Sequence, residues 1–423
     1  MLRNSAAGGR CPLATSLSHT DSRGCRGDPG DPGSQSQITR RDVLRAGLAI
    51  PALAVPFVAG CSRESASSSQ AGHRIPGQRL PAPGPGTTTS TTVGARGPLG
   101  SGEAVTFAFA GDTHFVDQWD TEGGANYSGV PVLAEQLTAD PTGVLSPIAP
   151  VLKGADLAMV NLETAITNRG EPVAGKAFHF RSPPESFAAL RAAGVDVINM
   201  ANNHALDYGP IGMADTFDAI ASSGLPVVGI GHDATEAYSP HRTVINGQRV
   251  AVFGAVDWLE PALVSKWTAT DAQPGLAFTI DPSRLLQAVR SARSEVDTLV
   301  VFLHWGVEQT HCASPEQHTL AVSLAAAGAD IVVGSHAHRV FGAGHIGSSL
   351  VAYGLGNFVY WREDGQSGSS GVLLVTATGR RIDAYSWVPA RITRGIPVPE
   401  GGAVAAADLG SWTQLRSCSG LSP

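Results

Sequence analysis

Residues 104–114 read AVTFAFAGDTH, an uncharged apolar run that ends abruptly in a polar cluster. The run 104–110 predicts a buried β-strand. Asp112 and His114 are two positions apart directly after it, so both side chains leave the strand end on the same side. The order of strand, Gly and closely spaced Asp and His is typical of a ligand site built at the end of a strand.

The same order recurs along the chain and predicts an α/β fold with largely parallel strands. Strands are expected at 104–110, 155–160, 195–200, 227–230, 249–253, 298–303, 331–333, 350–353 and 372–376. Helices are expected at 184–193, 212–223, 283–292 and 315–327, several of which end at a Gly in the C′ position. The stretch 257–278 has no clear period and is interpreted as an insertion or a lid.

Polar clusters follow these strands at their carboxyl ends. Besides GDTH at 111–114, they are NLE at 161–163, NNH at 202–204, HWG at 304–306 and GSHAH at 334–338. Ligands bind beyond the carboxyl ends of strands in open α/β sheets. We therefore expect the clusters to converge on one rim.

The converging residues include the donors that a pair of divalent cations requires. Such a centre needs mixed oxygen and imidazole ligands and one carboxylate able to bridge both ions. The candidate ligands are Asp112, His114, Glu163 as the bridge, Asn203, His304, His336 and His338. They predict a centre for two divalent metal ions, with Mn, Fe and Zn all compatible.

The N-terminal 61 residues read as an export signal. Arg40 and Arg41 precede an apolar run at 46–60 that is shorter than the ~20 residues of a spanning helix, so we expect a twin-arginine signal. The run ends in VAGC, which resembles the site at which bacterial lipoproteins are cleaved and acylated, and makes Cys61 the expected lipidation site. The protein is therefore predicted to be exported by the twin-arginine route and lipid-anchored at the outer face of the cell membrane.

Composition divides the rest of the chain. Residues 62–102 are rich in Ser, Gly, Pro and Thr and predict a flexible linker. A folded domain is expected at 103–395 and a weakly ordered tail at 396–423.

The formal charge of the chain is −7. Because residues 1–60 hold seven Arg and four Asp, the charge of the remainder is near −10. This acidic charge argues against nucleic-acid binding through a broad basic surface. Cys312 and Cys418 are the two cysteines of the folded part, and whether they pair stays open.

The ligand clusters resemble those of the calcineurin-like metallophosphoesterases, which implies a layered β-sandwich flanked by helices, in the order α/β/β/α. The resemblance assigns Asp112, His114, Glu163 and His338 to one metal, and Glu163, Asn203, His304 and His336 to the other. It gives His204 the role of the general acid that protonates the leaving oxygen, with Asp207 orienting it.

Further blocks are similar to the CapA family of poly-γ-glutamate capsule synthesis. They are FHFRSPPE at 178–185, ANNHALDYG at 201–209, HWGVE at 304–308 and YGLGNF at 353–358. Membership would imply membrane proteins of capsule-polymer synthesis as partners and an anionic polymer or a phosphoester as substrate. The resemblance suggests substrate contacts for Arg181, Trp305, Glu308 and Asn357.

Several assignments have alternatives that the sequence leaves open. Asp207 either orients His204 or caps the following helix. Arg181 is either a fork for phosphate or carboxylate groups or a surface ion-pair partner, and Trp305 and Glu308 either shape a substrate wall or only pack. The function is a metal-dependent hydrolase, a non-catalytic polymer-binding scaffold, or a general phosphodiesterase or nucleotidase.

Overall fold

A computed structural model describes residues 100–115, 132–363 and 365–423. The twin-arginine motif, Cys61 and the linker up to residue 99 lie outside these residues. Within the described part of the chain, no helix is both long and apolar enough to cross a membrane.

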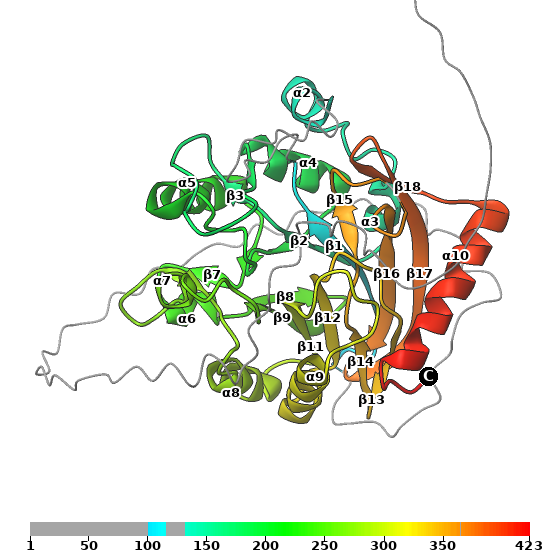
Figure 1. The fold of residues 1–423 in the computed structure, drawn as a ribbon. Coiled ribbons are helices and arrows are strands. Elements are labelled where there is room, and N and C mark those ends of the chain that lie inside the picture. The colour runs from blue at the N-terminus through cyan, green and yellow to red at the C-terminus, as the bar shows by residue number, and fades with distance from the viewer. Residues whose placement is uncertain (1–99, 116–131, 364) are drawn as a thin grey trace, which may run out of the picture.

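The AVTFAFAGDTH stretch forms β1 (Val105–Thr113) at the centre of an eight-stranded sheet. β1 pairs in parallel with β2 and antiparallel with β16. The sheet has the order β18-β17-β16-β1-β2-β5-β6, and β15 pairs with the end of β1 (Figure 1). Its other strands are β2 (Leu157–Leu162), β5 (Val197–Asn199), β6 (Val227–Val228), β15 (Asn357–Val359), β16 (Ser369–Thr378), β17 (Arg381–Thr393) and β18 (Ile396–Pro399).

A six-stranded sheet in the order β13-β14-β12-β11-β9-β8 faces the first one. Its inner strands are parallel to one another, and the two edge strands are antiparallel to their neighbours. Its strands are β8 (His241–Ile245), β9 (Gln248–Val256), β11 (Thr298–Trp305), β12 (Ile331–His336), β13 (Ala343–Ile346) and β14 (Ser349–Ala352). Two small ribbons pair β3 (Ala165–Ile166) with β4 (Arg181–Ser182), and β7 (Ile230–Gly231) with β10 (Gly275–Leu276).

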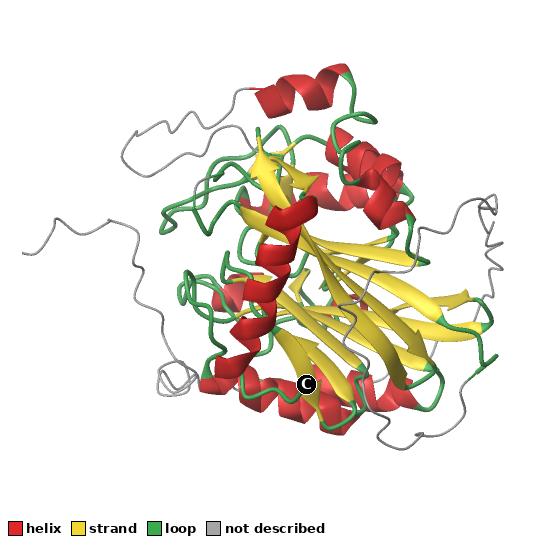
Figure 2. Cartoon of the chain, turned by 90° about the vertical axis from the view of Figure 1, so that its right-hand side faces the viewer, coloured by secondary structure: helices red, strands yellow, loops and turns green. Residues whose placement is uncertain are grey.

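Three apolar cores hold four layers together. Strand residues such as Phe107, Phe109 and Phe302 pack between the two sheets. The outer face of the larger sheet is covered by α2 (Val132–Ala139), α3 (Ala149–Lys153), α4 (Glu185–Ala193) and α5 (Gly209–Ser223). The outer face of the smaller sheet is covered by α6 (Ala234–Ala237), α8 (Ser283–Arg293) and α9 (Pro315–Ala327) (Figures 1 and 2). The predicted α/β/β/α sandwich is confirmed.

Each expected strand and helix has a counterpart in the structure, and the parallel strands carry the site as anticipated. Gly194, Gly224 and Gly328 end α4, α5 and α9 in the left-handed conformation, as their positions predicted. The prediction missed β3, β4, β8, β10, β13, β15, β17 and β18. These are short strands, edge strands or members of an antiparallel meander, and they lack the long continuous apolar run of a buried parallel strand.

The C-terminal residues differ from expectation. Residues 396–423 form β18, α10 (Gly402–Leu415) and a 3₁₀ turn (Arg416–Cys418) rather than a weakly ordered tail. Trp412 of α10 is buried, and its ring stacks on Trp387 of β17 at 5.9 Å between centroids. Figure 2 shows α10 lying across the sandwich. The expectation failed because the helix has a weak apolar periodicity and docks mainly through this one aromatic residue.

Segment 257–278 is also ordered by packing. Leu259, Leu263 and Trp267 are buried against the core of the larger sheet, and the segment includes α7 (Val264–Trp267). The burial shows an integral part of the layer rather than a lid.

Cys312 and Cys418 form a disulfide with their Cα atoms 5.4 Å apart. The bond joins the loop after β11 to the turn after α10. It resolves the pairing that the sequence left open.

Candidate metal centre

The polar clusters that follow the strands meet between the two sheets. Asp112 is the penultimate residue of β1, and Glu163 and Asn203 follow β2 and β5 of the larger sheet. His304 and His336 end β11 and β12 of the smaller sheet, and His338 follows two residues later. Both sheets present the carboxyl ends of parallel strands here, which is why residues distant in sequence come together.

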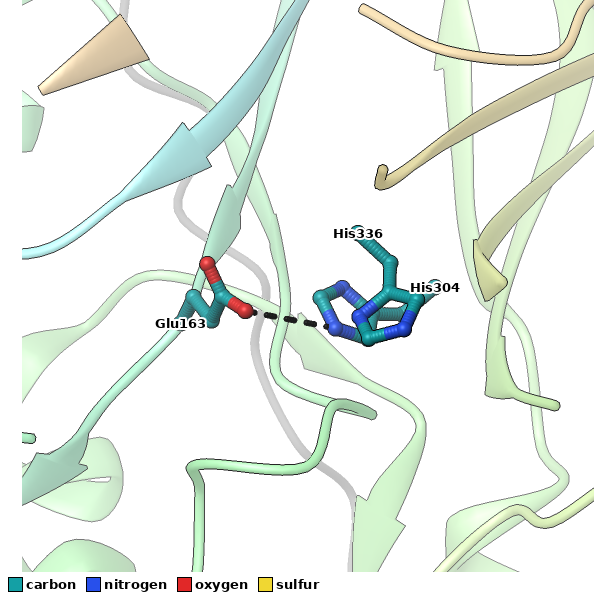
Figure 3. A group of neighbouring side chains, drawn as sticks. All are labelled: Glu163, His304 and His336. Atoms are coloured by element: carbon teal, nitrogen blue, oxygen red, sulfur yellow. Dashed lines mark ion pairs between the residues drawn. The ribbon is translucent and has the colours of Figure 1, made fainter. Parts of the chain in front are cut away.

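The ligand atoms form two groups that share one carboxylate. The donor atoms of Glu163, His304 and His336 lie within 4.8 Å of one another, and so do those of Asp112, Glu163 and His338. Figure 3 shows the first group, in which Glu163 Oε1 lies 3.3 Å from His304 Nε2. Asn203 Oδ1 lies 2.7 Å from the same nitrogen. Glu163 is therefore placed as a bridging carboxylate would be.

These residues fit a pair of divalent cations. Both carboxylate oxygens of Glu163 and both ring nitrogens of His336 are buried and have no hydrogen-bond partner among the described residues. Buried polar groups rarely stay unbonded without a reason such as an ion or water that completes them. A set of carboxylate, amide and imidazole donors suits Mn, Fe or Zn.

His114 lies in the same buried cluster but outside both groups of ligand atoms. Its ring packs between Phe180 and Tyr360, at centroid distances of 4.5 and 4.4 Å. Burial, followed by the charge of His204, lowers the pKa of His114 well below its usual range. The imidazole is thus neutral and can act as a donor, although the structure does not place it with the other ligands.

Asp112 is the most heavily bonded ligand. Its Oδ1 accepts from Asn161 Nδ2 at 2.8 Å, and its Oδ2 accepts from the backbone N–H of His336 at 3.0 Å. Burial raises the pKa of Asp112, but hydrogen bonding to His338 and the charge of His304 outweigh it and hold the pKa below the usual range. Asp112 therefore stays ionised although it is fully buried.

Burial and neighbouring charges also shift the pKa values of Glu163 and His338. Burial and then the charge of Asp112 raise the pKa of Glu163. Burial lowers the pKa of His338, but the nearby carboxylates, first Glu163, raise it to about 10. Without a cation, a proton on His338 supplies the positive charge that the carboxylates need.

The backbone at this edge is strained in order to aim the imidazoles. His336 and His338 have φ of 92° and 52°, in the left-handed region that non-glycine residues avoid. Such strain persists at functional sites where the surrounding structure fixes it. On the facing sheet, a Cβ on Gly111 would lie 1.9 Å from the carbonyl oxygen of Gly356, so only glycine allows β1 to bring Asp112 into place.

A network of asparagines supports the ligands, and the sequence did not single it out. Asn161 Nδ2 lies 3.1 Å from His304 Nδ1 in addition to its bond to Asp112. Its Oδ1 accepts from Asn199 at 2.8 Å and from Asn202 at 3.4 Å. These amides fix a carboxylate from one sheet and an imidazole from the other, a role for which the positions of the asparagines at strand ends were the only signal.

His204 and Asp207 form a buried pair beside the ligands. His204 Nδ1 lies 2.6 Å from Asp207 Oδ2, and the ring of His204 stacks on Phe180 at 4.0 Å. Tyr208, not Asp207, occupies the N-cap position of α5. Of the two interpretations of Asp207, the structure favours contact with His204. Burial raises the pKa of Asp207 to about 6 against the opposing charge of Lys176.

Lys176 and Glu260 belong to the same cluster and were missed. Lys176 is 2% exposed, and its Nζ lies 2.9 Å from Asp207 Oδ1 and 2.8 Å from Glu260 Oε1. An isolated lysine in a polar loop carries no sequence signal of burial, because lysine is almost always exposed.

The four residues expected to contact substrate have different surroundings. Trp305 is fully buried and donates to the carbonyl of Tyr353, so it packs, as one of its two interpretations had it. Side chains alternate along a strand, and the one after His304 points away from the site. Asn357 is also buried, with Oδ1 2.9 Å from His338 Nδ1, where it orients that ring.

Arg181 and Glu308 are half-buried. The guanidinium of Arg181 lies over the ring of Tyr208 at 3.9 Å, a cation–π contact. Glu308 follows β11, and its charge is among the causes that raise the pKa of His338. Glu308 therefore lies close enough to the centre to act on it electrostatically.

Comparison with known proteins gives related capsule proteins. The Capsule biosynthesis protein CapA of Bacillus anthracis is 32% identical over 259 residues, which is 60% of this chain and 62% of that protein. The PGA biosynthesis protein CapA of Bacillus subtilis (strain 168) is 30% identical over 230 residues, 54% of this chain and 59% of that protein. The chain thus spans about six tenths of the length of these relatives. A solved putative 5'-nucleotidase from Staphylococcus aureus aligns with 14% identity and a TM-score of 0.42, covering 74% of this chain and 58% of that one.

The model of the family described as Bacterial capsule synthesis protein PGA_cap matches residues 106–361, which is more than half of the chain and includes every candidate ligand. This chain belongs to the bacterial capsule synthesis protein family PGA_cap.

Proposed function

We propose that this chain is an exported lipoprotein of the CapA type that acts in the synthesis or export of poly-γ-glutamate or a related capsule polymer, and that its buried centre is a two-metal hydrolase site. The single observation that carries the hydrolase part is Glu163, whose carboxylate belongs to two adjacent groups of ligand atoms. The family match and the CapA relatives support the capsule role.

The residues divide into two sets of ligands. Asp112, Glu163 and His338 would hold one cation, and Glu163, Asn203, His304 and His336 the other. When bound, two such cations polarise the bond to be cleaved and make a water nucleophilic near neutral pH. Our assignment of His114 to the cation held by Asp112, Glu163 and His338 rests on the family resemblance.

His204 and Asp207 supply the proton chemistry. Asp207 lies against Nδ1 of His204, which leaves Nε2 available to carry a proton toward a leaving oxygen. Burial, followed by the charge of Lys176, lowers the pKa of His204 well below its usual range, so the ring is mainly neutral near neutral pH and its protonated form, a strong acid, is a minor species.

The substrate is proposed to be an anionic polymer or a phosphoester. Arg181 is available to meet phosphate or carboxylate groups, and Glu308 lies near the ligands. Membrane proteins of capsule-polymer synthesis are the proposed partners, and lipid on Cys61 would hold the domain at the outer membrane face after twin-arginine export.

Metal analysis and turnover test this proposal together. Purified protein is expected to hold two divalent cations per chain and to hydrolyse aryl phosphate mono- or diesters with Mn²⁺. A correctly folded protein that binds no metal under these conditions contradicts it.

A non-catalytic scaffold is the second candidate, and the depth of the centre favours it. Asp112, Glu163 and His336 are 0% exposed, which restricts the approach of a polymer. In cells, the combined change Asp112→Ala and His204→Ala separates the two roles. Unchanged capsule output supports the scaffold, and lost output supports the enzyme.

A further inference from the structure

Lys176 is a buried charge that the proposed function makes neither a metal ligand nor a proton donor. Its Nζ pairs with the carboxylates of Asp207 and Glu260 and donates a hydrogen bond to the backbone carbonyl of Asn203. It also lies 4.9 Å from the centroid of the Trp267 ring. Burying an ammonium costs several kcal/mol unless its partners are well placed, so this set of contacts is a specific arrangement.

The partners of Lys176 come from both halves of the sandwich. Asn203 and Asp207 follow β5 of the eight-stranded sheet, whereas Glu260 follows β9 of the six-stranded sheet. Lys176 itself lies in the loop between β3 and β4. Its ammonium therefore ties together three segments that no strand pairing connects directly.

The ligand group of Glu163, His304 and His336, together with Asn203, spans the same gap. Glu163 and Asn203 approach from the larger sheet, and His304 and His336 from the smaller one. The 2.7 Å separation between Asn203 Oδ1 and His304 Nε2 depends on how the two sheets' loops are held. Small errors in ligand placement weaken metal sites, and the residues that orient ligands often cost 10–100-fold in affinity when changed.

We propose that Lys176 is a positioning residue of the metal centre. By bonding the backbone of Asn203 and linking it to Glu260 across the sandwich, it sets the separation between Asn203 and His304 and so the affinity for the cation that these two residues would hold with Glu163 and His336. The inference rests on the proposed two-metal function, and its readouts are metal affinity and ligand position.

The test removes the tie while keeping the net charge of the cluster unchanged. Lys176, Asp207 and Glu260 together carry +1, −1 and −1, a net −1. Lys176→Met alone leaves two buried carboxylates unpaired and is expected to unfold. Lys176→Met combined with Glu260→Gln again leaves a net −1, carried by Asp207. Lys266→Met, an exposed lysine on the neighbouring helix α7, is the matched control.

Calorimetric titration of the full chain with Mn²⁺ alone, after metal removal, gives the affinity. Wild type and Lys266→Met are expected to bind two Mn²⁺ per chain. The double variant is expected to keep a cooperative thermal transition, to bind one Mn²⁺ as wild type does, and to bind the second at least about tenfold more weakly. Two sites of wild-type affinity in a folded double variant overturn the inference.

A crystal structure of the metal-free double variant supplies an independent readout. Asn203 Oδ1 is expected to move by about 1 Å or more from its place beside His304 Nε2. An unmoved Asn203 overturns the inference. If wild type binds fewer than two Mn²⁺, the proposed function fails, and the position of Asn203 still decides what Lys176 does.

Discussion

Glu163 is a buried carboxylate that lies close to a second carboxylate, that of Asp112. Both of its oxygens lack a hydrogen-bond partner within the described residues, and burial together with Asp112 raises its pKa. Such a group destabilises the metal-free fold and becomes favourable only when a cation offsets it. It is the residue at which folding and ligand binding conflict most directly.

Glu163→Gln should therefore separate stability from metal binding. Removing the charge is expected to raise the thermal midpoint of the metal-free protein, because a neutral amide is cheaper to bury than a carboxylate. Metal content should fall to at most one ion per chain. At a metal concentration 100 times the Kd of the lost site, the folded protein should also lose about 2.7 kcal/mol of stabilisation by metal. Thermal unfolding with and without Mn²⁺ measures both effects.

Glu236→Gln provides the comparison, since Glu236 is an exposed carboxylate paired with His232. This variant should change neither the thermal midpoint of the metal-free protein nor the metal content. A Glu163→Gln protein that retains two ions argues against the bridging role.

Asp330 lies away from the metal centre and makes the free energy of unfolding depend on pH. It pairs with Arg293 at 2.5 Å, and burial raises its pKa from 3.8 to about 6 against the attraction of that arginine. Because the folded state holds this proton more tightly than the unfolded state, the contribution of Asp330 to the free energy of unfolding is largest below pH 3.8. It falls as the pH rises from about 4 to 6, by at most about 3 kcal/mol.

Asp330→Asn should reduce the slope of unfolding free energy against pH between about pH 4 and 6 by the contribution of Asp330, as measured by urea denaturation. Asp271→Asn alters an exposed carboxylate paired with Arg284 and should leave the slope unchanged. An unaltered slope in Asp330→Asn would assign the effect to other groups.

At the scale of elements, adjacent positions of one strand serve opposite purposes. His304 and Trp305 end β11. His304 faces the other ligands, whereas Trp305 is buried toward the helices on the outer face. The alternation of a strand produces this division. Sequence patterns locate such strand ends well, but they do not tell which of two adjacent polar or aromatic residues faces the site without the layer on each side.

Helix α10 is docked by few contacts, which makes its attachment testable. Trp412 is its one buried residue among those described, and it packs on Trp387 and Tyr385. Trp412→Ala is expected to cost about 3 kcal/mol or more at this contact and to release the helix while the sandwich stays folded. Faster proteolysis between β18 and α10, with an unchanged main thermal transition, is the expected result.

Val404→Ala changes an exposed residue of the same helix and should leave proteolysis as in wild type. Loss of the main transition in Trp412→Ala would show instead that α10 is part of the cooperative core.

For the whole molecule, the sequence predicted the layers and most of the candidate ligands, but not the buried contacts that hold the ligands in position. The parallel strands have continuous apolar runs, and the ligands follow them at short spacings, so both were readable. The antiparallel strands β17 and β18 and the helix α10 lack such patterns. Lys176 and Glu260 could not be found, because a pairing between distant loops depends on how the two sheets face each other.

The N-terminal segment links this domain to a membrane in our proposal, and Cys61 is the residue that decides it. Cys61→Ala is expected to move the exported protein from the membrane fraction to the soluble fraction, since the acyl chains of a lipoprotein supply its anchor. Cell fractionation followed by immunoblotting measures the distribution. Cys25→Ala should leave the protein on the membrane, and a Cys61→Ala protein that stays there would contradict the anchor.

The bond between Cys312 and Cys418 has a topological consequence. It encloses 106 residues of sequence separation in one covalent ring, and this ring contains β12 with His336, the following His338 and the whole β16–β18 meander. A backbone break anywhere inside the ring leaves the severed pieces attached to each other. Damage to an exposed loop in this half of the protein would thus open the ring without shedding a fragment, and His336 and His338 would stay tethered to the sheet that holds Asp112.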